Sequence, residues 1–342
     1  MYKRNILFLI LIIWNIVITV MLFNKNEQKT TVTEETVYGI STDLTKVADT
    51  GNASCVVINS SFGKQSGFIY KQEEKTVYIV TTYHGIGSDK IATVTLANNK
   101  NYSGTIIGSD PFSDVAILSI ETEFQTQPVK CGDNELTNEG EFVINIGTND
   151  GDKFINNIQL GVVSKKLVPV VNNVEYQKNK YSIYEEDITL SLNSNEGNSG
   201  SPLFNMKSEI IGMVKMTDNN STYAITINEI KKIADAIIGG EEIQKIDLGI
   251  SGRYISSLKD YERNMLNIPF EILNGYYVES VSTKKAGYSL GIQQDDVILF
   301  INDKSILSQK DMLNFLYSKS KEVRITVFRE DRTIELQGSL ND

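Results

Sequence analysis

Short apolar runs separated by turn residues dominate the chain between residues 53 and 226. Gly, Asn, Asp and Ser cluster between the runs. Many short strands at even spacing, with turn residues between them, predict an all-β barrel or sandwich. No long helical period interrupts this region, which argues against an α/β hydrolase. The expected strands are Cys55–Ile58, Gly67–Tyr70, Val77–Thr81, Ile91–Leu96, Val115–Ile120, Phe142–Ile146, Ile188–Leu192 and Ile210–Val214.

A short helix and a glycine pair mark the end of this β-rich region. Asn228 is the expected N-cap of a helix over Glu229–Ile238, and Gly239 with Gly240 would end that helix. We therefore place a domain over residues 49–240 and a second one over residues 245–342.

The second region has a mixed pattern, typical of an α+β module. Strands are expected at Tyr276–Val281, Asp296–Ile301 and Val323–Arg329. Ser308 with Asp311 predicts a capping box for a helix that runs through Tyr317.

The amino terminus has the pattern of a membrane anchor. Residues 1–4 carry two positive charges, and residues 5–23 are nearly all apolar. As a helix that run is roughly 28 Å long, close to the thickness of a bilayer core. A cleaved signal peptide is the competing interpretation, but no A-x-A-like cleavage site follows the run. We expect a single-pass membrane protein, with residues 1–4 in the cytoplasm, residues 24–48 as a spacer and the rest outside the cytoplasm.

Composition narrows the chemistry further. The 342 residues include 33 Lys+Arg against 43 Asp+Glu, and the net charge of −10 argues against a nucleic-acid partner. A single histidine excludes metal sites that need two imidazoles, and two cysteines are too few for all-thiolate sites, so we expect neither metal nor cofactor. Cys55 and Cys131 either pair or remain free thiols.

Three short segments contain residues suited to nucleophilic catalysis. His84, the only histidine, follows an apolar strand, and Asp114 opens another strand, with Asp110 as a rival. Ser199 lies between two glycines in a loop over Glu196–Leu203. A nucleophilic serine needs a base within hydrogen-bond reach, and the base needs an orienting carboxylate.

The order His, Asp, Ser on an all-β pattern resembles the chymotrypsin-fold serine proteases, and most of all the HtrA/DegP family. The resemblance implies a double β-barrel with His84 as general base, Asp114 as its orienter and Ser199 as nucleophile. It also implies an oxyanion hole formed by the N–H groups of Gly197 and Ser199. The matching segments are Gly67–Ile69, Thr82–His84, Ser113–Leu118, Gly197–Gly200, Glu209–Gly212 and Tyr223–Ile225.

The carboxyl-terminal region resembles a bacterial PDZ domain, which takes an extended peptide onto a sheet edge and captures its terminal carboxylate. The resemblance assigns the peptide-binding loop to Gly275, Tyr276, Tyr277 and Val278, and the other wall of the groove to the helix from Ser308. The matching segments are Gly275–Val278, Gly291–Ile298 and Ile301–Asp303. Membrane anchor, protease and one PDZ domain, in this order, are the arrangement of membrane-anchored HtrA proteins.

Some residues depart from the family pattern. Ser201 replaces a glycine that usually follows Gly200, and Asp295 and Asp303 occupy turn positions where glycines are common. Gly-Asn-Ser-Gly-Ser-Pro also occurs in staphylococcal glutamyl endopeptidases, but that group uses a second histidine and has no PDZ domain. Asn193 is expected near the base of the specificity pocket, and its neutral side chain predicts cleavage after small or medium apolar residues.

Two functions compete at this point. The first is an HtrA-type serine endopeptidase, bacterial and linked to protein quality control and the stress response. It degrades misfolded or exposed extracytoplasmic proteins, and its PDZ domain binds peptide C-termini. The second is a non-catalytic peptide-binding scaffold or holdase on a protease fold. All three triad residues are present, which favours the enzyme. The resemblance also implies a homotrimer, since trimers are usual in the family.

Overall fold

The computed structural model describes residues 44–148, 156–176, 179–192, 194, 197–218, 221–243 and 245–340. The expected anchor over residues 5–23 and most of the spacer lie outside these residues. Among the helices that the structure describes, none is long and apolar enough to cross a membrane.

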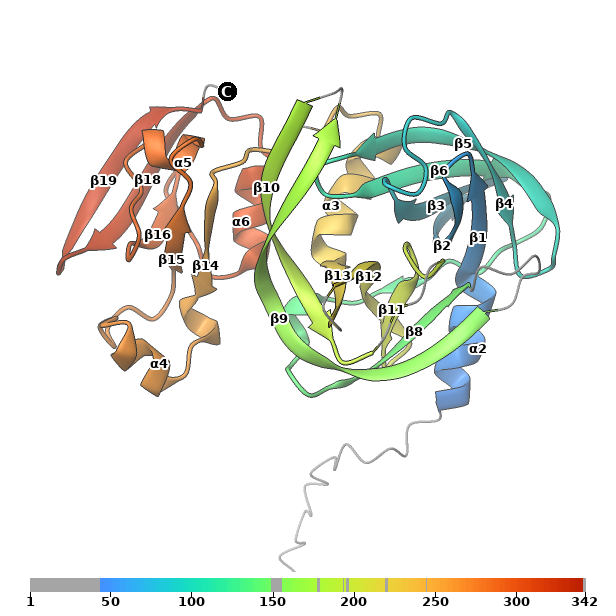
Figure 1. Ribbon diagram of the computed structural model, residues 1–342, viewed down its shortest axis with the longest axis horizontal. Coiled ribbons are helices and arrows are strands. Elements are labelled where there is room, and N and C mark those ends of the chain that lie inside the picture. The colour runs from blue at the N-terminus through green and yellow to red at the C-terminus, as the bar shows by residue number, and fades with distance from the viewer. Residues whose placement is uncertain are drawn as a thin grey trace, which may run out of the picture. The chain divides into compact units, whose positions relative to one another are not determined.

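The first β-domain is a closed barrel of six antiparallel strands in the order β1-β2-β3-β6-β5-β4 (Figure 1). Its interior is filled by aliphatic side chains, including Ile58, Ile79 and Leu118, none of which is exposed to solvent. Burial of such side chains is the main favourable contribution to folding. The strands are β1 (Cys55–Ser60), β2 (Gly63–Glu73), β3 (Thr76–Thr82), β4 (Ile91–Thr95), β5 (Asn101–Asp110) and β6 (Val115–Glu121).

The second sheet has the order β11-β8-β9-β10-β13-β12-β7, and an additional pairing of β11 with β12 closes six of its strands into a second barrel. The double barrel implied by the family resemblance is therefore confirmed. Figure 1 shows β9 and β10 as a long hairpin. The strands are β7 (Lys130–Cys131), β8 (Phe142–Thr148), β9 (Asn156–Tyr176), β10 (Asn179–Leu190), β11 (Pro202–Asn205), β12 (Glu209–Asp218) and β13 (Ser221–Thr226), with a 3-10 turn at Asn134–Leu136.

The helix α3 (Ile227–Ile238) packs across β5, β6 and β12 and joins the cores of the two barrels. Its N-cap is Thr226, not Asn228 as predicted from the sequence. The Asn228 side chain instead donates to the Asp133 carboxylate at 2.8 Å. Gly239 is the C-cap, as expected.

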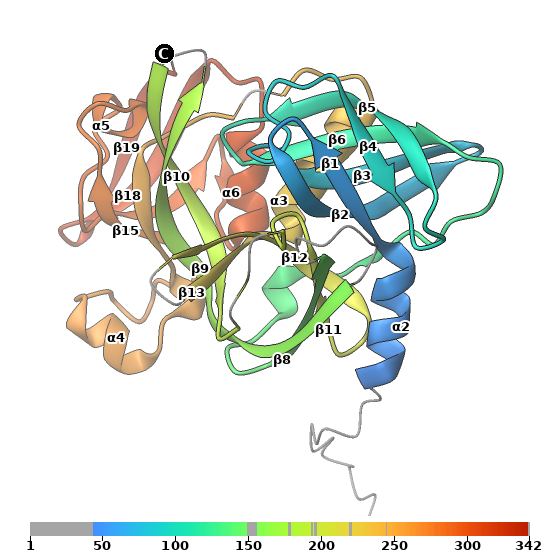
Figure 2. The same ribbon diagram turned by 45° about the vertical axis from the view of Figure 1, so that its right-hand side comes forward.

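One helix was not expected. The helix α2 (Leu44–Ser54) covers the end of the region that was predicted to be a spacer, and it lies beside β8 and β11 (Figure 2). Its sequence contains Gly51 and Asn52, residue types that disfavour helix. Burial stabilises it instead, since Val47 is 1% exposed and belongs to the core shared by the barrels. The spacer prediction is wrong from Leu44 onward.

The carboxyl-terminal region forms a separate sheet with the strand order β14-β15-β16-β18-β19, and β17 pairs with β16. The three predicted strands and the predicted helix are present. Asp295 and Asp303 both adopt a positive φ, which is how they replace the glycines common at these turns. The elements are β14 (Ile250–Tyr254), α4 (Asp260–Met265), β15 (Tyr276–Val281), α5 (Ala286–Ser289), β16 (Val297–Ile301), β17 (Lys304–Ser305), α6 (Gln309–Leu316), β18 (Glu322–Arg329) and β19 (Arg332–Ser339), with a 3-10 turn at Ile255–Ser257.

The cap of α6 differs in detail from the predicted box. Ser308 is the N-cap, but its side chain makes no capping bond to the helix backbone. The Asp311 carboxylate instead accepts from the Leu307 N–H at 3.0 Å and from the Ser308 hydroxyl at 3.1 Å. In a capping box the Asp311 carboxylate would accept from the N–H of the N-cap residue, Ser308. Here it accepts from the N–H of Leu307, one residue earlier.

Candidate active site

His84 lies two residues beyond the end of β3, a strand of the first barrel. The residues of β3 that precede it are buried, so the strand end is held by the barrel core. The His84 N–H donates to Oδ1 of Asp114 at 2.8 Å, and its Nδ1 lies 2.7 Å from Oδ2 of the same carboxylate. Both oxygens of Asp114 are therefore used to fix the backbone and the ring of His84.

The structure brings Asp114, rather than its rival Asp110, to the histidine. Asp110 is 4% exposed and accepts from the Phe112 N–H at 3.0 Å. Asp114 has φ +55°, a conformation that costs free energy for a residue with a side chain. Such strain persists only where the surroundings enforce it, and here it points the carboxylate at His84.

The electrostatics of His84 suit a group that takes up a proton. Burial lowers the pKa of His84, but the hydrogen bond and the charge of Asp114 outweigh it, so the pKa is raised above its ordinary value. The charge of Lys215 lowers it slightly. The side chain is still 51% exposed, so a substrate can reach the other ring nitrogen.

Ser199 lies in a loop of the second barrel that depends on its glycines. Gly197 has φ +92° and Gly200 has φ +84°. A Cβ on Gly200 would lie 2.1 Å from the backbone oxygen of Ser66, so no other residue fits there. Among the hydrogen bonds between described residues, none has the N–H of Gly197 or of Ser199 as its donor.

Ser66, on β2, ties this loop to the first barrel and was missed in the sequence. Its N–H donates to the Ser199 carbonyl at 2.9 Å, and its hydroxyl donates to the Gly197 carbonyl at 2.8 Å. The same hydroxyl accepts from the Thr148 N–H at 2.8 Å. A lone serine within a strand carries no signal for such a role, because the role depends on a loop far away in the sequence.

The Ser199 hydroxyl, the candidate nucleophile, bonds to a different partner. Ser199 Oγ donates to the backbone carbonyl of Lys215 at 3.0 Å. In the part of the chain that the structure describes, no hydrogen bond joins Ser199 to His84. In unliganded enzymes such catalytic bonds often form only when substrate arrives.

Ser201, the departure from the usual second glycine, is fully buried. Its hydroxyl accepts from the Asn145 amide at 2.6 Å, which compensates for the loss of contact with water.

Asn193, predicted at the base of the specificity pocket, lies outside the described residues. Both cysteines are free thiols, and burial raises the pKa of Cys131 to about 11.

The predicted peptide-binding loop at Gly275, Tyr276, Tyr277 and Val278 is wrong in its placement. Gly275 immediately precedes β15 and the other three residues begin it, and β15 is an interior strand that pairs with β14 on one side and β16 on the other. Tyr276, Tyr277 and Val278 are at most 5% exposed. A peptide cannot add to a strand whose two edges are already paired.

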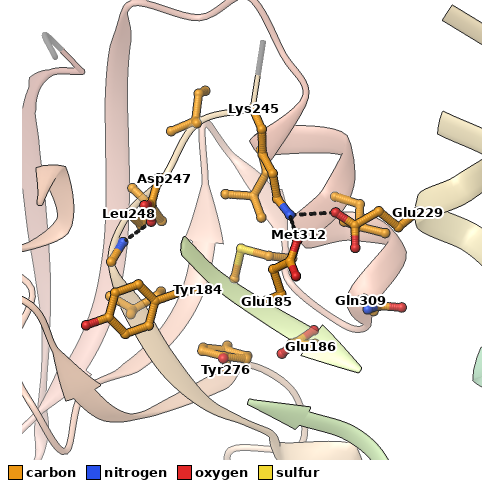
Figure 3. Close-up of a pocket in the computed structure, with 15 residues that line it drawn as sticks. Tyr184, Glu185, Glu186, Glu229, Lys245, Asp247, Leu248, Tyr276, Gln309 and Met312 are labelled. Atoms are coloured by element: carbon orange, nitrogen blue, oxygen red, sulfur yellow. Dashed lines mark hydrogen bonds and ion pairs between the residues drawn. The ribbon is translucent and has the colours of Figure 1, made fainter. Parts of the chain in front are cut away.

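The sheet edge lies one strand further out, at β14. A cavity of about 50 Å³ opens between the segment leading into β14, the helix α6 and strand β10 (Figure 3). Its apolar side includes Met312, Leu313 and Leu316, and its polar side includes Lys245 and Glu229. A cavity of this size has room for a few water molecules but not for a peptide.

Among the described residues, no group of three or more His, Cys, Asp or Glu side chains is arranged to hold a metal ion. The candidate site contains a hydroxyl, an imidazole held by a carboxylate, and backbone N–H groups, which are the kinds of group that acyl transfer uses.

Comparison with known proteins agrees with this geometry. Residues 65–213 match the trypsin-like peptidase domain. The chain thus contains a trypsin-like peptidase domain, in agreement with its two β-barrels. The curated relatives that it matches are HtrA-like serine proteases. The Staphylococcus haemolyticus protein "Serine protease HtrA-like" is 28% identical over 90% of this chain and 49% of its own length.

A relative from another genus has a similar description. The Lactobacillus helveticus protein "Serine protease Do-like HtrA" is 26% identical over 82% of this chain and 69% of its own. The chain spans about half the length of the first staphylococcal relative, and 37% of the Staphylococcus aureus one.

Solved structures share the chymotrypsin-like HtrA fold. The HtrA-type protease AlgW with tripeptide has a TM-score of 0.56 at 19% identity and covers 86% of this chain and 95% of its own. A serine endoprotease from Yersinia pestis has a TM-score of 0.53 at 18% identity and covers 88% of this chain and 98% of its own. At this level of identity the likeness shows the fold alone.

Proposed function

We propose that this chain is an HtrA-type serine endopeptidase that cleaves misfolded or exposed proteins through a Ser-His-Asp acyl-enzyme mechanism. The observation that carries the proposal is the pair of bonds from one carboxylate, Asp114, to the N–H and the ring of the only histidine. His84 and Asp114 belong to the first barrel, and the second barrel carries Ser199 in a loop with Gly197 and Gly200.

The proposed reaction begins when Ser199 Oγ leaves the Lys215 carbonyl and turns to the free Nε2 of His84. Oγ attacks the substrate carbonyl carbon while His84 takes its proton, and Asp114 stabilises the imidazolium. The N–H groups of Gly197 and Ser199 bind the oxyanion. His84 then gives the proton to the departing amine, which leaves an acyl-enzyme. Water hydrolyses this ester by the same steps, with His84 again as base.

The direct test compares casein cleavage by the full chain with cleavage by Ser199→Ala. Loss of a protease nucleophile costs on the order of 10⁶ in kcat, so cleavage should vanish. Equal cleavage by both proteins would overturn the proposal. The non-catalytic alternative, a holdase, predicts no cleavage by the unaltered chain and equal suppression of aggregation by both proteins.

We also propose that the carboxyl-terminal sheet is a PDZ domain that binds peptide C-termini between β14 and α6. The edge position of β14 and the apolar side chains of α6 support this site. Residues 184–186 of β10 line the cavity, so we expect β10 to shift when a peptide binds. The test is the binding of a fluorescent peptide with an apolar C-terminus and a free terminal carboxylate. Binding should be lost in Met312→Asp, and it should also be lost when the C-terminus of the peptide is amidated. Binding unaffected by that substitution would contradict it.

The sequence supports a proposal for the location and assembly of the enzyme. We propose a single-pass anchor at residues 5–23, with the protease and PDZ domains outside the cytoplasm, and a homotrimer as the assembly. The apolar run with its preceding charges supports the anchor, and the family resemblance supports the trimer. Protease protection in intact cells and sedimentation of the purified protein test these two points.

For specificity, we propose cleavage after small or medium apolar residues. A peptide-library profile dominated by cleavage after Arg or Lys would contradict this preference.

A further inference from the structure

A cluster of buried charged side chains lies where β10, α3, the segment after α3 and α6 meet (Figure 3). The side chains of Lys215, Glu185, Lys245 and Glu229 are each at most 4% exposed. Removing charges from water is costly, and apolar residues of the same volume often give equal or greater stability. The proposed reaction uses none of these four side chains, so their burial calls for another explanation.

Lys245 is the centre of this cluster. Its Nζ donates to Oε1 of Glu229 at 2.6 Å, to Oγ of Ser113 at 3.1 Å and to Oε1 of Glu185 at 3.5 Å. Three acceptors thus match the three protons of an ammonium group. Burial lowers the pKa of Lys245, but the charges of Glu229 and Glu185 outweigh it, so the pKa is raised and the group stays charged.

Tyr317, which caps the end of α6, reaches the same place from the carboxyl-terminal sheet. Its hydroxyl donates to Oε1 of Glu229 at 2.8 Å and lies 2.8 Å from Oγ of Ser113. Its ring lies under Nζ of Lys245, 5.7 Å from the centroid. Ser113 is fully buried, and its hydroxyl also donates to Oε1 of Glu229 at 3.1 Å. Its hydroxyl thus contacts residues from three separate parts of the chain.

Ser113 is bonded directly to Asp114, whose backbone has the unfavourable positive φ described above. A residue held in such a conformation needs its neighbours to keep it there. The two oxygens of Asp114 make bonds of 2.8 Å and 2.7 Å to His84, which leave little room for displacement. The position of Ser113 therefore determines whether the carboxylate of Asp114 meets His84.

A second arm of the cluster leads to the nucleophile. The other oxygen of Glu185 accepts from Nζ of Lys215 at 2.8 Å, and Asp187 lies 2.7 Å from the same Nζ. The backbone carbonyl of Lys215 is the group that holds Ser199 Oγ. One continuous set of polar contacts thus extends from Tyr317 to the neighbours of both Asp114 and Ser199.

We propose that Tyr317 and Lys245 are positioning residues that act through Ser113 to hold Asp114 against His84. The carboxyl-terminal sheet would then contribute directly to the competence of the base. The functional meaning of this inference rests on the proposed protease activity, but the contact itself is tested without activity.

The only histidine of the chain makes the test direct. In the full-length protein, labelled with ¹⁵N-histidine and kept in detergent, all imidazole NMR signals come from His84. Its pKa is measured in the unaltered chain, in Tyr317→Phe and in Ser113→Ala. Neither substitution changes a charge, and both keep the packing nearly intact. Tyr261→Phe, which alters an exposed tyrosine on α4, is the matched control.

The expected result is a lower His84 pKa in Tyr317→Phe and Ser113→Ala than in the control, because a displaced Asp114 stabilises the imidazolium less well. Casein hydrolysis should lose roughly tenfold in kcat with little change in KM. The double variant should lose no more than the larger single loss, because both changes break one path.

Lys245→Met separates positioning from direct electrostatics. Removal of a nearby positive charge alone would raise the His84 pKa, whereas displacement of Asp114 lowers it. An unchanged His84 pKa in folded Tyr317→Phe and Ser113→Ala would overturn the inference. If these pKa values fall but the unaltered chain cleaves nothing, the positioning contact stands and the proposed function fails.

Discussion

The two halves of the candidate active site are in different states. On the first barrel, His84 and Asp114 are joined by two short hydrogen bonds, in the geometry that acid–base catalysis requires. On the second barrel, Ser199 donates to the Lys215 carbonyl instead. The fold therefore holds the proposed base in place, whereas the proposed nucleophile, Ser199, would have to leave the Lys215 carbonyl before it could bond to His84.

The largest expected effect comes from breaking the assembled half. Asp114→Asn should lower kcat about 10⁴-fold, because the amide no longer holds the imidazole in the required tautomer or stabilises its charged form. Steady-state casein hydrolysis measures the loss, with Asp260→Asn, at an exposed position of α4, as control. A larger loss in Asp110→Asn than in Asp114→Asn would show that the wrong carboxylate has been assigned.

The next largest effect should come from the link between the halves. Ser66→Ala removes the hydroxyl that bonds to the Gly197 carbonyl and to the Thr148 N–H. The loop that presents the oxyanion donors should then shift, with a loss of roughly 10² in kcat. Ser103→Ala, at an exposed position of β5, is the matched control. Equal kinetics in the two variants would mean that this link does not position the loop.

The pH dependence of kcat/KM sharpens the description of the base. His84 must be neutral to accept a proton, and its pKa is raised above the ordinary value of about 6.5. Activity should therefore rise with pH through a pKa above 6.5 and fall about tenfold per unit on the acid side. An apparent pKa below that of a free imidazole would contradict the pairing with Asp114.

The smallest effect is expected within the nucleophile half. Ser201→Gly restores the residue usual in the family but leaves the buried Asn145 amide with only the Pro202 carbonyl as acceptor, at 3.2 Å. We expect about 1 kcal/mol lower stability and only a few-fold change in kcat. Thermal unfolding and casein kinetics measure both. A large gain in activity would show that Ser201 restrains the nucleophile.

The sequence predicted what depends on local pattern. Strands such as β3 and β6 are short apolar runs between turn residues, and the positions of His84, Asp114 and Ser199 relative to them could be read directly. The helix α2 could not be predicted, because its propensity is poor and its stability comes from packing on a core built later in the chain.

Contacts between distant segments were also beyond the sequence. Ser66 is more than a hundred residues from the loop that it holds, and Lys245 gains its partners only after three segments have packed together. The misplaced peptide-binding loop has the same origin. Gly275–Val278 has a strand pattern, but only the pairing of β14 with β15 shows that this strand is interior.

The most direct test of the account is to map a fluorophosphonate adduct on the full-length protein by mass spectrometry. The account predicts one adduct, on Ser199, that forms at least 10³-fold more slowly in His84→Ala and is absent in Ser199→Ala. An adduct on another serine, or equally fast labelling without His84, would contradict the assignment of Ser199 as nucleophile and His84 as its base.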